Sequence, residues 1–494
     1  MNRLITYTIL YFLATAVSIL AENPKREFRG AWMHVIGQSQ YANMTTEQTQ
    51  QYLCSQLDKL RNAGVNAIIF QVRPQADALY KSNLEPWSRY LTGTAGKAPN
   101  PMWDPLNFMI DECHKRGMEL HAWLNPYRVT SSAKQVPAEG HIYHKYPKRF
   151  IRYDGKLYFD PGQPENREFI NKVVADIVTR YNVDAIHMDD YFYPYPVNKK
   201  PFPDNASYAK YGKGMKLEDW RRENVNQLIK ELNATIKSIK PWVRFGISPF
   251  GVWRNKSSDP RGSDTNALEN YDALYADVLL WTEQGWVDYM LPQLYWELDH
   301  PKASSEVLAY WWDKNTNGRH MYYGQAVEWT MNASDIAPSN NPTQLDHKIA
   351  LTRQLENVQG NCWWPGYSVT KNYKGVADSL ANNRQSTVAL VPAYSWIDSI
   401  APEGVTHLKL DEQKLTWRKV LTSDLMQVQR AFVVYAFPKG AKVDLENSKA
   451  ILGVTYTNSY TLPSHMKGEY TIAVTALDAA NNESNTAATL EIKL

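Results

Sequence analysis

Between residue 28 and about residue 380, apolar segments of strand length alternate regularly with longer segments of helical period. The predicted strands cover residues 28–35, 67–72, 119–124, 185–188, 244–247, 289–294, 320–327 and 360–364. The predicted helices cover residues 45–62, a segment that begins at 104, and residues 164–181, 217–239, 270–284, 304–315, 343–355 and 372–382. Eight such units predict a parallel (β/α)8 barrel, the TIM-barrel fold. A doubly wound sheet fits less well, because no glycine-rich dinucleotide loop follows an early strand.

The pattern changes after about residue 386, where short alternating strands replace the strand–helix units. These strands are predicted over residues 405–410, 414–418, 431–436, 459–462 and 470–477. Turn residues separate them and no helical pattern intervenes, which is typical of a small all-β sandwich of the immunoglobulin type. We therefore predict a barrel over residues 26–385 and a sandwich over residues 390–494. The sandwich sequence contains no cluster of candidate catalytic residues.

The first 21 residues have the outline of a secretory signal peptide. Arg3 precedes an apolar run that extends from residue 4 to residue 20, and small side chains at Ala16, Ser18 and Ala21 come before the chain turns polar. We predict an exported protein of the periplasm, the cell envelope or the extracellular space. The alternative is an uncleaved anchor, because the run is long enough to span a bilayer. No other segment of the sequence has that length and apolarity.

The composition argues against several classes of function. A formal net charge of +3 is nearly balanced, so a nucleic-acid partner is not indicated. The three cysteines and the isolated histidines do not have the spacing of a disulfide framework or a zinc site. No Gly-x-Ser-x-Gly elbow and no glycine-rich phosphate loop occurs. We expect neither a metal ion nor a cofactor.

The ends of five predicted barrel strands are unusually polar and aromatic, and functional residues of such barrels lie where strands run into the following loops. Side chains able to hydrogen-bond sugar hydroxyls or an acetamido group are Gln71, Arg73, Asn125, His187 and Gln293. Aromatic rings able to stack on sugars are Trp32, Tyr127, Tyr191, Tyr295 and Trp296, together with Trp253 and Trp364. Any one of these aromatic residues is more often part of a core. Together on one rim they indicate a carbohydrate-binding site.

Carboxyl groups at the same rim predict the chemistry. Strand periodicity directs Asp189 into the barrel mouth and Asp190 toward the neighbouring loops, although a bulge at the strand end would reverse this. The same period places Glu297 at the mouth. Hydrolysis of a glycosidic bond needs two carboxyl groups that flank it. Asp189 and Glu297 are the predicted pair, with Asp190 as a further candidate and Glu328 as the alternative partner. The spacing that decides between retention and inversion is left open.

Three functions are consistent with this pattern. The first is a glycoside hydrolase that cleaves O-glycosyl bonds in a cell-envelope glycan. The second keeps the chemistry but acts on a dietary or host polysaccharide, and the third is a non-catalytic carbohydrate-binding barrel. A pair of acids favours an enzyme, because binding alone does not require one.

Seven ordered motifs resemble the bacterial glycosyl-hydrolase-like family 10 domain over roughly residues 26 to 380. They are EFRGAW (27–32), NAIIFQVRP (66–74), GMELHAWLNPYR (117–128), DPG (160–162), DDYFYP (189–194), GISPFG (246–251) and PQLYW (292–296). The resemblance implies an exported barrel hydrolase, in a family with a member that acts on peptidoglycan glycan strands lacking stem peptides. It also implies the acidic role for Asp189 and Asp190, and Arg73, Asn125 and Gln293 as cleft residues. The C-terminal tail resembles a fibronectin type III domain.

Overall fold

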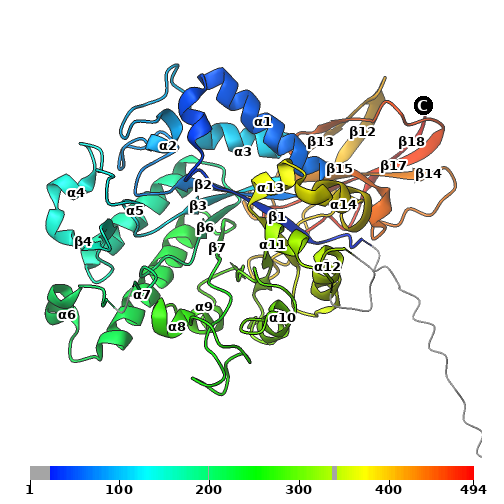
Figure 1. The fold of residues 1–494 in the computed structure, drawn as a ribbon. Coiled ribbons are helices and arrows are strands. Elements are labelled where there is room, and N and C mark those ends of the chain that lie inside the picture. The colour runs from blue at the N-terminus through cyan, green and yellow to red at the C-terminus, as the bar shows by residue number, and fades with distance from the viewer. Residues whose placement is uncertain (1–22, 198–199, 336–341) are drawn as a thin grey trace, which may run out of the picture.

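The computed structural model describes residues 23–197, 200–335 and 342–494, so the predicted signal peptide lies outside the described residues. Its main part is a barrel of parallel strands ringed by helices, with a smaller all-β region beside it (Figure 1). The barrel strands are β1 (Phe28–Met33), β2 (Ala67–Arg73), β3 (Glu119–Leu124), β6 (Ala185–Met188), β7 (Arg244–Ile247), β8 (Tyr289–Met290), β9 (His320–Met321), β10 (Tyr323–Ala326) and β11 (Gly360–Trp364).

The strand order confirms the predicted TIM barrel. Neighbours pair in the order β10-β11-β1-β2-β3-β6-β7-β8-β9, and every pair is parallel. Strands β9 and β10 are two halves of one predicted strand, separated at Tyr322. A parallel bridge between Gln293 and Gly324 joins the segment after β8 to β10 and so closes the ring.

The helices follow the strands in the predicted alternation. The longer ones are α1 (Thr46–Asn62), α3 (Pro105–Lys115), α5 (Pro164–Arg180), α7 (Leu217–Ile239), α10 (Ser305–Asp313) and α12 (Leu345–Gln354), and α9 (Val278–Glu283) is a short one. Shorter elements are α2 (Arg89–Thr92), α4 (Ile142–Lys145), α6 (Asn205–Tyr211), α8 (Asn270–Ala273), α11 (Val327–Asn332), α13 (Gly366–Thr370), α14 (Val376–Ser379) and the hairpin β4 (Phe150–Tyr153) and β5 (Lys156–Phe159). Single turns are η1 (Ser39–Asn43), η2 (Pro147–Arg149), η3 (Tyr373–Gly375), η4 (Leu380–Arg384) and η5 (Ser448–Ala450).

Local sequence signals explain where several helices begin. Helix α1 starts with a capping box, in which the Thr45 side chain accepts from Gln48 N and the Gln48 side chain accepts from Thr45 N. Helix α3 starts with Asp104 as its N-cap and proline at its first position, as predicted. The predicted helix 270–284 is split into α8 and α9, because Tyr275 between them adopts a left-handed φ of 54°.

The barrel interior contains small residues that make room for large aromatic side chains. A Cβ atom on Gly246 would lie 1.9 Å from the Tyr289 ring, so only glycine lets that ring fill the barrel axis. A Cβ atom on Gly324 would lie 2.8 Å from the Trp32 ring. Ala185 is fully buried in the same cluster, as expected for a small inward residue. The interior is therefore a packed core whose upper layer holds Trp32 below the mouth.

The C-terminal region has seven strands in two antiparallel sheets. The strands are β12 (Thr406–Asp411), β13 (Lys414–Arg418), β14 (Ala431–Pro438), β15 (Ile451–Thr455), β16 (Ser459–Thr461), β17 (Glu469–Leu477) and β18 (Ala488–Lys493). One sheet has the order β12-β13-β16 and the other β15-β14-β17-β18. This arrangement fits the predicted all-β domain, although β15 and β18 were not among the predicted strands. The more specific assignment to the fibronectin type III type stays a prediction.

The sandwich contacts the barrel at the amino ends of its strands, opposite the mouth. Asn481 Nδ2 donates to Glu119 Oε1 at 2.9 Å, at the start of β3. Arg244, at the start of β7, donates to Ala479 O at 3.2 Å and forms a buried ion pair with Glu119. The carboxyl ends of the strands are consequently left free of the sandwich.

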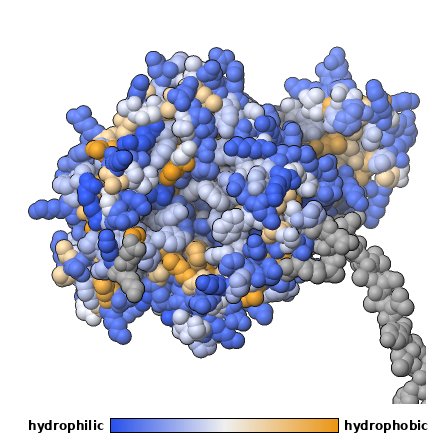
Figure 2. Space-filling model, in the orientation of Figure 1, coloured by the Kyte–Doolittle hydropathy of each residue, from blue (hydrophilic) through white to orange (hydrophobic). Residues whose placement is uncertain are grey.

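None of the helices in residues 23–197, 200–335 and 342–494 combines the length and apolarity needed to cross a bilayer. The face drawn in Figure 2 is mostly hydrophilic, with apolar side chains in small separate groups.

Candidate active site

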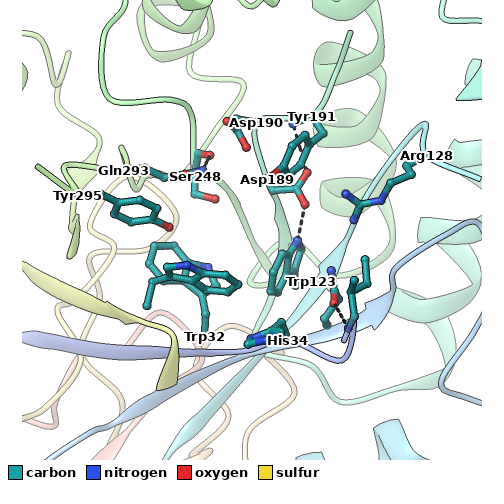
Figure 3. Close-up of a pocket in the computed structure, with 13 residues that line it drawn as sticks. Trp32, His34, Trp123, Arg128, Asp189, Asp190, Tyr191, Ser248, Gln293 and Tyr295 are labelled. Atoms are coloured by element: carbon teal, nitrogen blue, oxygen red, sulfur yellow. Dashed lines mark hydrogen bonds between the residues drawn. The ribbon is translucent and has the colours of Figure 1, made fainter. Parts of the chain in front are cut away.

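A pocket of about 340 Å³ lies at the carboxyl ends of the barrel strands, where the barrel predicts the functional residues (Figure 3). Its lining combines two carboxylates, one guanidinium group, one imidazole and five aromatic rings. The lining residues are Trp32, His34, Ile36, Gln71, Trp123, Arg128, Asp189, Asp190, Tyr191, Ser248, Gln293, Tyr295 and Trp364. They come from strands β1, β2, β3 and β11 and from the segments that follow β1, β3, β6, β7 and β8.

Asp189 is held by three hydrogen-bond donors. Trp123 Nε1 donates to its Oδ2 at 3.0 Å, and Asn125 Nδ2 donates to its Oδ1, also at 3.0 Å. The backbone N–H of Tyr191 donates to Oδ1 at 3.3 Å. Burial raises the pKa of Asp189 above the ordinary value, while the charge of Arg128 and these donors oppose the rise. The environment therefore fixes the carboxylate in place and favours its ionised form over that of its neighbour.

Asp190 has a different environment. Its side chain is 2% exposed, and its Oδ2 accepts a short hydrogen bond from the Tyr195 hydroxyl. Burial, followed by repulsion from Asp189, raises the pKa of Asp190 to about 7, and hydrogen bonds from Tyr195 and Gln293 only partly offset this. Two neighbouring carboxyls whose environments push their pKa values apart are the usual arrangement for an acid and a carboxylate with separate roles.

Both aspartates line one pocket, which corrects the prediction that Asp190 points toward the neighbouring loops. The period of two assumed an extended strand through both residues. Strand β6 ends at Met188, and the chain bends at Asp190. The alternation of faces stops applying at that point, so both side chains reach the cavity.

The loop after β3 is fixed by a buried arginine. Arg73 forms a two-point ion pair with Glu85, with Nε to Oε2 at 2.7 Å and Nη2 to Oε1 at 2.5 Å. Its Nη1 donates to the carbonyl oxygens of Asn125, at 2.5 Å, and of Pro126, at 3.1 Å. Arg73 is fully buried and does not line the pocket. The structure therefore places Arg73 behind the cavity and not in the cleft as predicted, where it holds the loop that carries Asn125 and Arg128.

A column of polar side chains runs from the pocket into the barrel. Ser248 Oγ lies 3.1 Å from His187 Nε2, and His187 Nδ1 lies 2.9 Å from the Tyr289 hydroxyl. The same hydroxyl lies 2.9 Å from His121 Nδ1, and His121 Nε2 lies 3.0 Å from Glu119 Oε2. Burial holds the pKa of His187 well below its ordinary value, so this imidazole is neutral. His187 thus supports the floor of the pocket and does not line it.

Five aromatic side chains form the walls of the cavity. They are Trp32, Trp123, Tyr191, Tyr295 and Trp364. Tyr191 is 39% exposed, which makes it a platform at the rim, whereas Trp32 is buried at the base. In Figure 3, Tyr295 and Gln293 lie on the opposite side of the cavity from Arg128. A ring-shaped ligand with apolar faces and polar edges fits such a lining.

Two acids predicted or considered for the mouth lie outside the pocket. Glu297 is exposed and does not line the cavity, because the chain bends at Trp296 on its way to α10. Glu328 is exposed on α11, where its Oε1 accepts from Ser368 Oγ at 3.0 Å. The structure therefore does not bring Glu297 or Glu328 together with Asp189, and Asp190 is the second carboxyl in the cavity.

The other predicted binding residues separate into two groups. Gln71, Trp32, Tyr191, Gln293 and Tyr295 line the pocket as predicted. The remaining four do not contact the cavity: Asn125 and His187 lie directly behind lining residues, Tyr127 is fully buried, and Trp296 packs beside Phe250 with ring centroids 5.3 Å apart. Trp253, also considered as a stacking platform, is buried in the core.

Several residues of the site were not singled out by the sequence. His34, Ile36, Trp123, Arg128 and Ser248 line the pocket, and Tyr195 donates to Asp190. Most of them lie in or beside the motifs at the strand ends, so those motifs are the sequence signal that could have identified them. Among the residues that the structure describes, no group of three or more His, Cys, Asp or Glu side chains is placed to hold a metal ion.

Comparison with known proteins agrees with this architecture. The family model described as glycosyl hydrolase-like 10 matches residues 27–339. The chain is 44% identical over 400 residues to glycosyl hydrolase YngK of Bacillus subtilis, which covers 79% of this chain and 78% of that protein. It is 42% identical over 332 residues to glycosyl hydrolase DigH of Escherichia coli K12, which covers 63% of this chain and 74% of that protein.

Likeness to solved structures is more distant. The glycoside hydrolase domain of PgaB (BpsB) from Bordetella bronchiseptica is 11% identical, with a TM-score of 0.48. The match covers 72% of this chain and 99% of that domain.

Proposed function

The chain belongs to the glycosyl hydrolase-like 10 family and is a glycoside hydrolase, and on that basis we propose that it cleaves peptidoglycan strands lacking stem peptides. The observation that carries the proposal is the pair Asp189 and Asp190 in an aromatic-walled pocket at the mouth of the barrel. The two carboxyls supply an acid and a carboxylate, and the rings and amides supply faces and edges suited to a polymer of acetamido sugars.

Asp190 is proposed as the general acid. Its pKa of about 7 leaves about half of the molecules with a protonated carboxyl near neutral pH, available for donation to the leaving glycosidic oxygen. Asp189 is proposed as the carboxylate that stabilises the positive charge developing at the anomeric carbon. Its three donors hold it in one position, so little reorganisation is needed when that charge appears.

We also propose that the protein is exported to the periplasm, the cell envelope or the extracellular space. The proposal is supported by the signal-peptide pattern of residues 1–21, which lie outside the described part of the chain, and it is consistent with the cell-wall substrate proposed above.

The pH dependence of turnover follows from the two carboxyls. The acid form of Asp190 is lost as pH rises through its pKa of about 7, so kcat/KM is expected to fall about tenfold per pH unit above that value. On the acid side the rate falls as Asp189 becomes protonated, which gives a bell-shaped profile. The measurement is kcat/KM against pH on strands of defined length. A flat profile from pH 6 to pH 9 would contradict the role of Asp190.

Glu297→Gln is expected to change kcat and KM by no more than about twofold, because an exposed side chain outside the cavity contacts neither the substrate nor the two aspartates. Steady-state kinetics on the same strands checks this. A loss of a hundredfold or more with an unchanged unfolding temperature would return Glu297 to the catalytic pair.

The substrate is tested with intact and amidase-treated peptidoglycan. The purified protein is incubated with both, and the released sugars are identified by mass spectrometry. We expect release from the amidase-treated strands and little from the intact polymer. Release from neither, together with release from a plant or host polysaccharide, would replace the cell-wall substrate. Tight binding to strands without release from any glycan would favour a binding barrel.

A further inference from the structure

The pocket contains one cationic side chain, Arg128, whose partners leave most of its guanidinium group available. Its Nε donates to Pro74 O at 3.2 Å, and its guanidinium carbon lies 5.0 Å from the centre of the Tyr191 ring. Its backbone N–H donates to Asn125 Oδ1 at 2.8 Å, which fixes the start of the side chain. In Figure 3 the guanidinium group points into the cavity from the side of Asp189 and Tyr191.

Arg128 differs in this respect from the buried arginines elsewhere in the barrel. Arg73 is paired with Glu85, Arg221 with Asp204, and Arg244 with Glu119. Across residues 23–197, 200–335 and 342–494, no carboxylate lies within ion-pair distance of Arg128. A half-buried guanidinium group in a cavity retains unused donors in a forked geometry that suits a carboxylate.

Asp189, which also lines the pocket, does not supply that partner. Both oxygens of Asp189 accept hydrogen bonds from Trp123, Asn125 and Tyr191, and none from Arg128. The charge of Arg128 nevertheless acts on the pKa of Asp189 through space. Arg128 is therefore close to the reacting centre, with its hydrogen-bonding capacity directed to something outside the described chain.

We infer that Arg128 binds a carboxylate carried by the sugar chain, next to the bond that is cleaved. The inference rests on the proposed function and deepens it. Two kinds of amino-sugar polymer carry such a group: muramic acid strands, through their lactyl ether, and polymers that alternate acetamido sugars with uronic acids. In peptidoglycan with stem peptides the lactyl carboxyl is an amide without charge. Arg128 would therefore distinguish stripped strands from intact ones by charge as well as by size.

The test compares charged and neutral versions of one strand. Peptide-free strands are used directly and after coupling of their carboxyls to methylamine, which gives neutral amides of nearly the same size. For the native protein, kcat/KM on the charged strands is expected to exceed that on the neutral strands about 10- to 100-fold, the range of hydrogen bonds between charged groups. In Arg128→Met the ratio should fall to about one, while Arg128→Lys should keep part of it.

For each variant, the ratio of kcat/KM on charged strands to kcat/KM on neutral strands reports recognition of the carboxylate, separately from effects on catalysis itself. Loss of the Arg128 charge also raises the pKa of Asp189, which lowers turnover on both strands alike and cancels in the ratio. A native-sized ratio in Arg128→Met would overturn the inference. So would equal rates of the native protein on both strands.

A binding measurement covers the case in which turnover is absent. Asp190→Asn is titrated with charged and neutral strands, and equal affinities would overturn the inference. Uronic-acid polymers and their carboxyl-reduced forms identify the source of the carboxylate. A charge preference for these polymers alone would support the role of Arg128 and refute the cell-wall substrate. Cleavage of both strands at equal rates would refute the role of Arg128 and leave the hydrolase function intact.

Discussion

Asp189→Asn is expected to lower kcat on the order of 10²- to 10³-fold while leaving KM nearly unchanged. The carboxylate is aligned by Trp123, Asn125 and the Tyr191 amide, and its charge is used only when the anomeric carbon becomes positive. An asparagine keeps the size of the side chain but places an NH2 group where one of these donors points. Steady-state kinetics gives kcat and KM. The affinity is measured separately, by titrating the protein with strands under single-turnover conditions.

The fold of that variant is checked by its thermal unfolding temperature. An unchanged temperature with unchanged kcat would remove Asp189 from catalysis. A joint loss of turnover and affinity would indicate that it binds ground-state substrate instead of the transition state.

Asp190→Asn is expected to lower kcat on natural strands about 10²- to 10⁴-fold, the range that one general acid contributes. The change removes the only proton that the pair can donate, and it removes the alkaline limb of the pH profile. The loss should depend on the leaving group. An aryl glycoside with an acidic phenol needs little protonation, so cleavage of its glycosidic bond by the variant should be nearly normal.

Tyr195→Phe is the matched control for this experiment, because it deletes the hydroxyl that donates to Asp190 and keeps the carboxyl. Its kinetics should retain both limbs of the pH profile, with the alkaline limb displaced upward, since a hydrogen bond that favours the carboxylate is lost. An equal loss on aryl glycosides and natural strands in Asp190→Asn would contradict the acid role.

Much of the barrel could be predicted because its local and global signals agree. The eight strands are apolar runs bounded by turns, and α7 begins and ends at the residues that its periodicity predicts. The failures have local causes. Helix 270–284 is interrupted by the left-handed conformation of Tyr275. Strand β15 is five residues long with Gly453 at its centre, and strand β18 mixes polar and apolar residues, so neither gives a clear strand pattern.

The sequence predicts where the site lies in the barrel, but it does not predict which side chains contact one another there. The motif at residues 189–194 locates the acids correctly at the end of β6. The two-residue period of a strand does not hold beyond the end of the strand. Regular pairing of β8 ends at Met290, so the period does not predict the direction of Glu297, seven residues further along. Arg73 was predicted in the cleft from its place at the end of a strand and from the family resemblance, and neither shows its pairing with Glu85. Such pairings depend on how loops fold back, which no period in the chain encodes.

The catalytic pair at the end of β6 is tested by the rate of reducing-end release from amidase-treated peptidoglycan. The native protein, Asp189→Asn, Asp190→Asn and Glu297→Gln are assayed together at one protein concentration. We expect release by the native protein and by Glu297→Gln at similar rates, and at least a hundredfold less by each aspartate variant. Release by the aspartate variants within tenfold of the native rate, with all four proteins folded, would contradict a catalytic centre at the end of β6.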